Sequence, residues 1–303
     1  MRCSLSCVLI SVCFASTAGY AQSAPSAMAP PAMAPPAMVP PAIYTDPPVD
    51  AAHPAAMSVL HIPSHGVLIN GLLYSPGGAG SHATLVICHG LPGNEKNLDL
   101  AQAVRRAGWN AVTFNYRGSW GSPGSFRFAQ NLQDAAAVLA YLRDPSHAKL
   151  GIDSQRIVIL GHSMGGWVAA HTAGHDPALK GAVLISMADL GLIAARPRAQ
   201  AVAEMADDME TLADVTPESM VDEIKSHAQQ FLLAGAAPGL AQMPVLVLTA
   251  NDHLASHADA LVAAIKAKGG TQVTAMHVDT DHGWSDHRIA LESEVLTWLA
   301  GLH

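Results

Sequence analysis

The residues best suited to chemistry form one short run, Gly161-His162-Ser163-Met164-Gly165. This G-x-S-x-G pattern directly follows the apolar run RIVILG at 156–161 and directly precedes a segment with helical spacing. A strand, a tight turn and a helix in that order lift a serine hydroxyl out of a sheet and place it at a helix N-terminus, where the helix dipole favours negative charge. The pattern therefore predicts that Ser163 is a nucleophile. The alternative is a glycine-rich turn with an inert serine.

A serine hydroxyl is a weak nucleophile, so it needs a general base, and the base needs an acid to orient it. Asp252 follows the apolar run at 243–250, and His282 follows another at 273–278. Both lie at the carboxyl ends of predicted strands, where the sites of open α/β sheets assemble. The sequence therefore predicts a catalytic trio of Ser163, Asp252 and His282.

Other acids and histidines compete for these roles. Asp279 and Asp281 precede His282 closely, but both come later in the chain than the usual position of the acid. His253 and His257 have the i, i+4 spacing of a helical metal site, but the sequence has no acidic cluster or cysteine near them. We therefore expect no metal at this pair.

A second glycine turn stands where an oxyanion hole is needed. Residues 85–93 read LVICHGLPG, a strand that runs into a turn at Gly90. In such a turn a backbone N–H points at the oxygen that becomes negative in the transition state. We predict that the N–H groups of Leu91 and Met164 are the two donors. An ordinary Gly/Pro turn is the alternative.

The segment 115–124 (NYRGSWGSPG) follows another predicted strand and is expected at the same rim. Tyr116 and Trp120 are predicted to contact substrate, with packing inside the loop as an equal alternative. Arg117 is expected to pair with a local acid rather than with a substrate carboxylate.

The elements that must position these residues alternate between apolar runs and amphipathic stretches, which predicts a mostly parallel sheet covered by helices on both faces, the α/β class. The interval 190–240 interrupts this rhythm with helical patterns, so we expect a small helical cap there. Thr216-Pro217-Glu218 is typical of a helix start. The expected strands are 57–62 and 66–74, as an antiparallel pair, then 84–89, 110–116, 156–161, 181–186, 243–250 and 273–278, and the expected helices are 97–107, 130–143, 164–174, 256–268 and 286–300.

The segments 89–126 (HGLPGN…GSF), GHSMGG, TANDH and DTDHGWSDHR together resemble the α/β-hydrolase superfamily, over roughly residues 57–303. Within it the chain is similar to prolyl oligopeptidase-type and dienelactone-hydrolase-like bacterial serine hydrolases, although it lacks a propeller domain. The resemblance implies a cofactor-free hydrolase in which Ser163, Asp252 and His282 form the triad and Leu91 and Met164 the oxyanion hole.

The N-terminal region precedes this domain. Residues 1–21 combine Arg2, an apolar stretch at 5–15 and a small-residue end, which predicts a signal peptide and an exported protein, periplasmic or secreted. An uncleaved anchor is the alternative. Residues 22–56 are rich in Pro, Ala and Met and are predicted to be a disordered linker. Cleavage would leave Cys88 as the last cysteine, so no internal disulfide is expected.

Composition excludes several classes of partner. The net charge is −8 and no basic run occurs, so nucleic acid is not expected to bind. No apolar run beyond the N-terminus approaches the length of a membrane span, so no stable membrane insertion is expected after signal cleavage. The expected function is hydrolysis of a small-molecule carboxylic ester through an acyl-enzyme on Ser163. A peptidase acting on short peptides and a catalytically silent binding domain are the alternatives.

Overall fold

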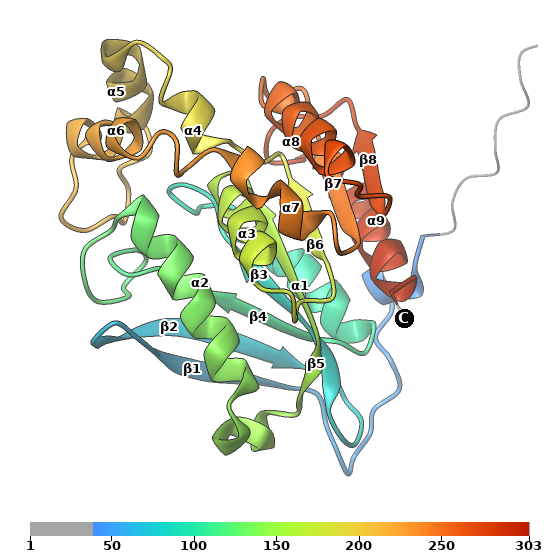
Figure 1. The fold of residues 1–303 in the computed structure, drawn as a ribbon. Coiled ribbons are helices and arrows are strands. Elements are labelled where there is room, and N and C mark those ends of the chain that lie inside the picture. The colour runs from blue at the N-terminus through green and yellow to red at the C-terminus, as the bar shows by residue number, and fades with distance from the viewer. Residues whose placement is uncertain (1–38, 303) are drawn as a thin grey trace, which may run out of the picture. The chain divides into compact units, whose positions relative to one another are not determined.

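The computed structural model describes residues 39–302, and its centre is an eight-stranded sheet. The strands stand in the order β1-β2-β4-β3-β5-β6-β7-β8 (Figure 1). The six strands from β3 to β8 are parallel, and β1 and β2 form an antiparallel hairpin that joins the sheet through β4. Their bounds are β1 Ala56–Ser64, β2 Val67–Ser75, β3 His82–Cys88, β4 Asn110–Phe114, β5 Ile152–His162, β6 Ala182–Ile185, β7 Val245–Thr249 and β8 Val273–His277.

Helices cover both faces of the sheet, as Figure 1 shows. α1 (Leu98–Arg106) and α9 (Arg288–Ala300) pack on one face around a hydrophobic cluster of their own. α2 (Phe128–Arg143), α3 (Met164–His175) and α8 (Ala255–Ala267) pack on the other. The central strands are buried along their whole length because both faces are covered, which accounts for their continuous apolar runs. The α/β class and the parallel sheet are confirmed, with element boundaries within four residues of those predicted.

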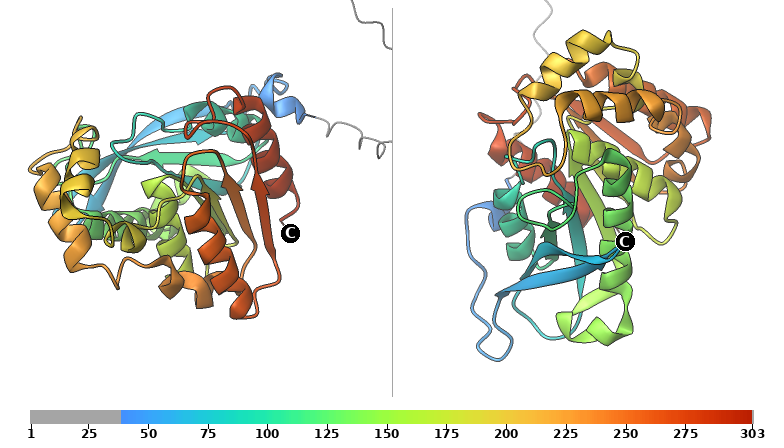
Figure 2. Two further views of the ribbon diagram at one scale, coloured as in Figure 1. Left: turned by 90° about the horizontal axis from the view of Figure 1, so that it is seen from above. Right: turned by 90° about the vertical axis from the view of Figure 1, so that its left-hand side faces the viewer.

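The predicted cap interval holds only short helices: α4, α5 and α6 lie together at one end of the molecule, whereas η3 and α7 pack against α3 and α8 (Figure 2). The helix start at Thr216 is confirmed: its hydroxyl accepts the Ser219 N–H, and the Ser219 hydroxyl accepts the Thr216 N–H. Glu223 ties the cap to the domain by accepting the N–H groups of Phe128 and Ala129 at the start of α2. The elements are α4 Leu190–Ile193, α5 Arg198–Ala206, α6 Pro217–Ser226, the 3₁₀ helix η3 Leu233–Ala236 and α7 Ala237–Leu240.

The structure differs from the sequence analysis over the second half of the predicted linker. Residues 39–55 lie against the domain, and a 3₁₀ helix, η1, spans Pro41–Ile43. The side chain of Arg106 in α1 donates to the carbonyl oxygens of Ala42 (2.5 Å) and Ile43 (3.0 Å). Proline-rich backbone has few N–H donors but keeps its carbonyls, so an arginine can still hold it. The predicted signal peptide, 1–21, and the first part of the linker, 22–38, lie outside the described residues.

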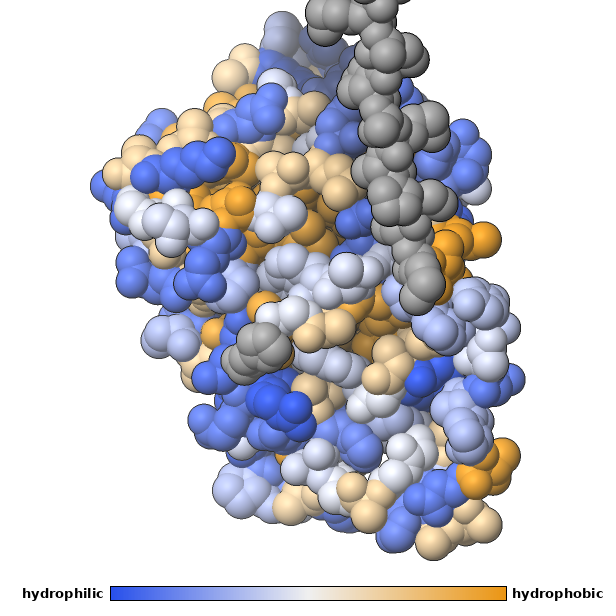
Figure 3. Space-filling model, turned by 90° about the vertical axis from the view of Figure 1, so that its right-hand side faces the viewer, coloured by the Kyte–Doolittle hydropathy of each residue, from blue (hydrophilic) through white to orange (hydrophobic). Residues whose placement is uncertain are grey.

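On the face shown in Figure 3, hydrophilic and hydrophobic residues are interspersed. Within residues 39–302, no helix has the length and hydrophobicity required to cross a bilayer.

Candidate active site

Ser163 occupies a sharp turn between β5 and α3. Its backbone has φ 58° and ψ −123°, a conformation that side-chain-bearing residues rarely adopt. Gly161 and Gly165 make the turn possible, because a Cβ atom on Gly161 would collide with the Gly165 carbonyl, and one on Gly165 would collide with the Cys88 carbonyl. Gly90 in the neighbouring loop packs closely against the serine, because a Cβ atom on Gly90 would lie only 3.1 Å from the Ser163 Cβ. The glycines of the motif are thus required by the turn itself.

Asp252 and His282 are joined by a hydrogen bond at the ends of β7 and β8. The distance from His282 Nδ1 to Asp252 Oδ2 is 2.9 Å, and the Asp252 side chain is 2% exposed. Burial raises the pKa of Asp252, but hydrogen bonds from His282, the Leu254 N–H and the Ser186 hydroxyl outweigh it and lower the pKa to about 2. Asp252 is therefore an anion at neutral pH, and it holds the proton of His282 on Nδ1, which leaves Nε2 free to act as a base.

Neither of the competing acids, Asp279 and Asp281, is hydrogen-bonded to His282. The Asp279 side chain is 93% exposed and lies 3.8 Å from His277, not beside His282. Asp281 accepts the N–H of Ser285 at 2.8 Å, which turns its carboxylate along its own loop.

The pair His253 and His257 does not converge on a common point for a metal. His257 Nδ1 accepts the backbone N–H of Asp189 at 3.0 Å, whereas His253 lies in the pocket wall. In the part of the chain that the structure describes, no group of three or more His, Cys, Asp or Glu side chains is arranged to hold a metal ion.

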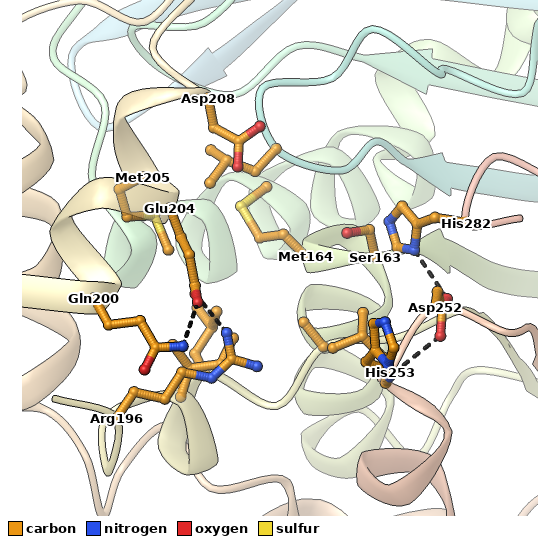
Figure 4. Close-up of a pocket in the computed structure, with 15 residues that line it drawn as sticks. Ser163, Met164, Arg196, Gln200, Glu204, Met205, Asp208, Asp252, His253 and His282 are labelled. Carbon is orange, nitrogen blue, oxygen red and sulfur yellow. Dashed lines mark hydrogen bonds and ion pairs between the residues drawn. The ribbon is translucent and has the colours of Figure 1, made fainter.

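Ser163 and His282 lie side by side on one wall of a pocket, with the serine hydroxyl turned into the cavity (Figure 4). Among the hydrogen bonds within residues 39–302, none joins that hydroxyl to His282. Such bonds commonly tighten only when substrate is bound. The structure thus brings the three predicted residues together at one pocket.

The predicted oxyanion-hole residues also border this pocket. Leu91 and Met164 line it beside Ser163. Met164 is the first residue of α3, so its N–H has no partner within the helix and is available to a ligand. The loop that carries Leu91 lies against the serine through Gly90. Both backbones therefore border the nucleophile.

Tyr116 and Trp120 do not line the pocket, so the prediction that they contact substrate is wrong. Tyr116 is fully buried, and its hydroxyl donates to the carbonyl of His89 at 3.2 Å. The indole N–H of Trp120 donates to the carbonyl of Pro92 at 2.8 Å. Both aromatics pack under and support the loop that carries Leu91, which is the loop-packing alternative.

Arg117 pairs with a local acid, as expected. Its Nε lies 2.6 Å from Asp134 Oδ1, and both side chains are buried. Asp134 also accepts the Arg117 N–H and the Ser64 hydroxyl, so α2, β1 and the segment after β4 meet at one carboxylate. This cluster is scaffold, because it lies outside the pocket lining.

The pocket has a volume of about 600 Å³, and the wall opposite Ser163 comes from the cap. Figure 4 shows Glu204 and Asp208 on that wall. Glu204 is paired with Arg196 at 2.5 Å. Burial, together with Asp207, raises the pKa of Asp208 to about 6. Sequence reasoning did not assign these residues to the site, because the cap sequence carries no motif. The pocket is lined by Leu91, Ser163, Met164, Ala188, Leu190, Ile193, Arg196, Gln200, Glu204, Met205, Asp208, Asp252, His253, Leu254 and His282.

Part of the chain matches a protein family and curated relatives. Residues 79–228 match the family Hydrolase_4, described as serine aminopeptidase, S33. This range includes Ser163 but ends before Asp252 and His282. An uncharacterized protein of Mycobacterium tuberculosis is 28% identical over 132 residues, which are 43% of this chain and 46% of that protein. The match thus spans about half the length of the curated relative.

Solved structures resemble a much larger part of the chain. An esterase of Pyrobaculum calidifontis is 22% identical, covers 84% of this chain and 88% of its own, and has a TM-score of 0.61. An acylaminoacyl peptidase of Pyrococcus horikoshii is 16% identical, covers 82% of this chain and 42% of its own, and has a TM-score of 0.63. A dienelactone hydrolase from Klebsiella pneumoniae, described as putative, is 18% identical, covers 82% of this chain and 99% of its own, and has a TM-score of 0.58. With the sheet order and the serine turn, these likenesses show that the chain has the α/β-hydrolase fold, and the family match over residues 79–228 agrees with it.

Proposed function

We propose that the protein is a serine hydrolase that cleaves carboxylic esters of small or medium acyl groups through an acyl-enzyme on Ser163. The observation that carries the proposal is the convergence of a strained serine turn and a buried Asp252–His282 pair on one pocket. Each feature has another explanation when taken alone. Together they supply the nucleophile, the base and the acid that acyl transfer requires.

In the acylation step, His282 Nε2 takes the proton of the Ser163 hydroxyl while Oγ attacks the carbonyl carbon of the ester. The carbonyl oxygen becomes an oxyanion, and the N–H groups of Leu91 and Met164 stabilise it. The anionic Asp252 stabilises the imidazolium that forms. The tetrahedral intermediate then collapses, the alcohol leaves with the proton from His282, and the acyl group stays on Ser163.

In the deacylation step, a water molecule enters where the alcohol left. His282 Nε2 removes one of its protons, and the hydroxide attacks the acyl carbon. Collapse of this second intermediate releases the carboxylic acid and returns the proton to Ser163. Atoms and charge balance with water as the only co-substrate.

The pocket walls favour an apolar acyl group next to the serine. Aliphatic and thioether side chains surround Ser163 on the domain side and continue into the cap, and burial of each CH₂ group of a substrate against them is worth about 0.8 kcal/mol. The volume of about 600 Å³ accepts small to medium acyl groups. The side chains concerned are Leu91, Met164, Ala188, Leu190, Ile193, Met205 and Leu254.

A second candidate function is hydrolysis of aminoacyl or short peptide bonds. It is favoured by Asp208, which has no hydrogen-bond partner among the described side chains and faces the pocket from the cap. A carboxylate in that position attracts a substrate ammonium group. The family description, serine aminopeptidase, and the acylaminoacyl peptidase structure agree with this candidate.

We also propose that the enzyme is exported, to the periplasm or outside the cell. The proposal rests on the charge, apolar stretch and small-residue end of residues 1–21. N-terminal sequencing of the protein recovered from the periplasm and the medium of its host tests it. A start at Gln22 supports export, and a chain that retains residues 1–21 in the cytoplasm contradicts it.

Two measurements test the catalytic proposal. A fluorophosphonate probe should label the wild type on Ser163, and the Ser163→Ala variant should take no label. A panel of p-nitrophenyl esters and aminoacyl p-nitroanilides should then give the higher kcat/KM for the esters. Absence of label on the wild type contradicts serine hydrolase chemistry, whereas labelling with a preference for anilides replaces the esterase by the peptidase.

A further inference from the structure

His162 stands between the last glycine of β5 and the nucleophile, at a position that the G-x-S-x-G pattern leaves open. It is 4% exposed. Its Nε2 lies 2.8 Å from the backbone carbonyl oxygen of His282, and the centroids of the two imidazole rings are 4.7 Å apart. His162 therefore precedes the nucleophile directly in the chain, and its side chain is hydrogen-bonded to the backbone of the residue that supplies the base.

The direction of this hydrogen bond is fixed by chemistry. A carbonyl oxygen only accepts, so Nε2 of His162 must carry the proton. Burial lowers the pKa of His162 to about 4, and the charges that act on it come from His282, Arg288 and Asp252. At neutral pH the ring is an uncharged donor, which adds no positive charge beside the base that must accept the serine proton.

Asp252 alone does not fix the position of His282. The bond from Nδ1 to Asp252 orients the ring, but it leaves the backbone of the loop after β8 free to shift. Several further contacts hold that loop, including a hydrogen bond from Arg288 to the Gly283 carbonyl at 3.1 Å. His162 donates to the carbonyl of His282 itself, and the indole N–H of Trp284, two residues on, donates to the Ser186 hydroxyl at 3.1 Å. Of these, only His162 is also attached to the serine turn.

We propose that His162 is a positioning residue that sets the distance between His282 Nε2 and the Ser163 hydroxyl by tying the backbone of the base to the turn of the nucleophile. The inference rests on the proposed function, because it assigns His162 to the same acyl-transfer reaction. A displacement of about 1 Å between reacting groups costs on the order of 100-fold in rate. Loss of this tie should therefore slow the chemical step and leave substrate binding nearly unchanged.

The variants His162→Gln and His162→Asn form a matched pair. Both keep a polar amide in the buried site, but the glutamine N–H group extends about as far from Cα as imidazole Nε2, whereas the asparagine group ends near the position of Nδ1. We expect His162→Gln to keep kcat within about 5-fold of the wild type. We expect His162→Asn to lose about 10- to 100-fold in kcat, with KM changed by less than about 2-fold.

His171 provides a control in the helix that follows the serine turn. It is also a buried histidine that bonds to a backbone carbonyl, that of Phe231 at 3.3 Å, but it lies outside the pocket lining. His171→Asn should lower the melting temperature about as much as His162→Asn and leave kcat unchanged. An equal loss of kcat in the two asparagine variants would show that the effect comes from core destabilisation, and it would overturn the proposal.

The rate of fluorophosphonate labelling, measured on the folded fraction, is the second readout, because it reports activation of Ser163 without any substrate specificity. It should fall in His162→Asn in parallel with kcat. If the Asn and Gln variants label at equal rates, fast or slow, the reach of the donor is irrelevant and only this inference is overturned. A wild type that takes no label overturns the proposed function and this inference with it.

Discussion

The two walls of the pocket are built by different physical means. On the side of His282, the anchoring acid is buried and bonded to backbone: Asp252 is 2% exposed and accepts the Leu254 N–H, while the His282 ring that it orients is 42% exposed. On the cap side, the polar contacts are half exposed: the side chains of Arg196 and Glu204 are 33% and 39% accessible. Exposed ion pairs contribute little, about 0–1 kcal/mol, whereas buried charge-assisted hydrogen bonds fix geometry.

This difference separates the requirements of catalysis from those of selectivity. Acyl transfer requires reacting atoms that are held in place before the substrate arrives, and the sheet supplies rigid strand ends for that purpose. Recognition of a particular acyl group tolerates adjustable walls, and the short helices of the cap supply them. α5, for example, buries only Ala201 and Met205. If the comparison holds, substitutions on the sheet side change kcat, and those on the cap side change the choice of substrate.

The largest effect is expected from Ser163→Ala, which removes the nucleophile from the sheet side. Loss of a triad serine typically costs on the order of 10⁶ in kcat. The turn itself should survive, because its shape depends on Gly161 and Gly165 rather than on the hydroxyl. Steady-state turnover of a p-nitrophenyl ester and a melting curve check both statements. Retention of more than about a hundredth of wild-type kcat would remove Ser163 from its role.

The next largest effect is expected from Asp252→Asn. The asparagine keeps the shape but favours the wrong tautomer of His282, which costs on the order of 10⁴ in kcat. Asp279→Asn and Asp281→Asn are the matched controls, since neither carboxylate is hydrogen-bonded to His282. We expect both controls to stay near wild-type kcat on the same ester. If Asp279→Asn loses kcat and Asp252→Asn keeps it, the triad acid is Asp279, and its assignment to Asp252 is wrong.

The same contrast explains how much the sequence could predict. The strands and the positions of Ser163, Asp252 and His282 follow from local patterns, because a tight turn needs glycines and parallel strands end at one edge. Whether Tyr116 faces the pocket or the core depends on the path of the loop, and no spacing rule encodes that path. Likewise, the cap residue Asp208 reaches the pocket only through helix packing. The hydrogen bond from Arg106 to the backbone next to Pro41 is also a tertiary contact, so no local pattern in the proline-rich segment predicts it.

A third prediction concerns acid stability on the sheet side. The folded-state pKa of Asp252, about 2, is below its ordinary value of 3.8. The pairing therefore stabilises the fold fully above about pH 4, and this contribution, on the order of 2 kcal/mol, is lost as the pH falls through 2. Urea unfolding between pH 5 and pH 2 should show a shallower decline of the free energy of unfolding for Asp252→Asn than for the wild type. Asp279→Asn, which alters an exposed carboxylate, should follow the wild-type slope.

The smallest effect is expected on the cap side, from Asp208→Asn. The pKa of this carboxyl, about 6, means that it becomes an anion as the pH rises from 5 to 7. An exposed or half-buried charge pair is worth about 0.2–1 kcal/mol, so the anion should lower KM for an aminoacyl ester with a free ammonium group by at most about 5-fold. The advantage of that ester over its uncharged N-acetyl counterpart should therefore grow between pH 5 and pH 7 in the wild type. The advantage should stay constant with pH in Asp208→Asn, where no charge develops.

If kcat for the neutral ester falls more than about 10-fold in this variant, the cap side takes part in catalysis. The division of catalysis and selectivity between the two walls would then be wrong.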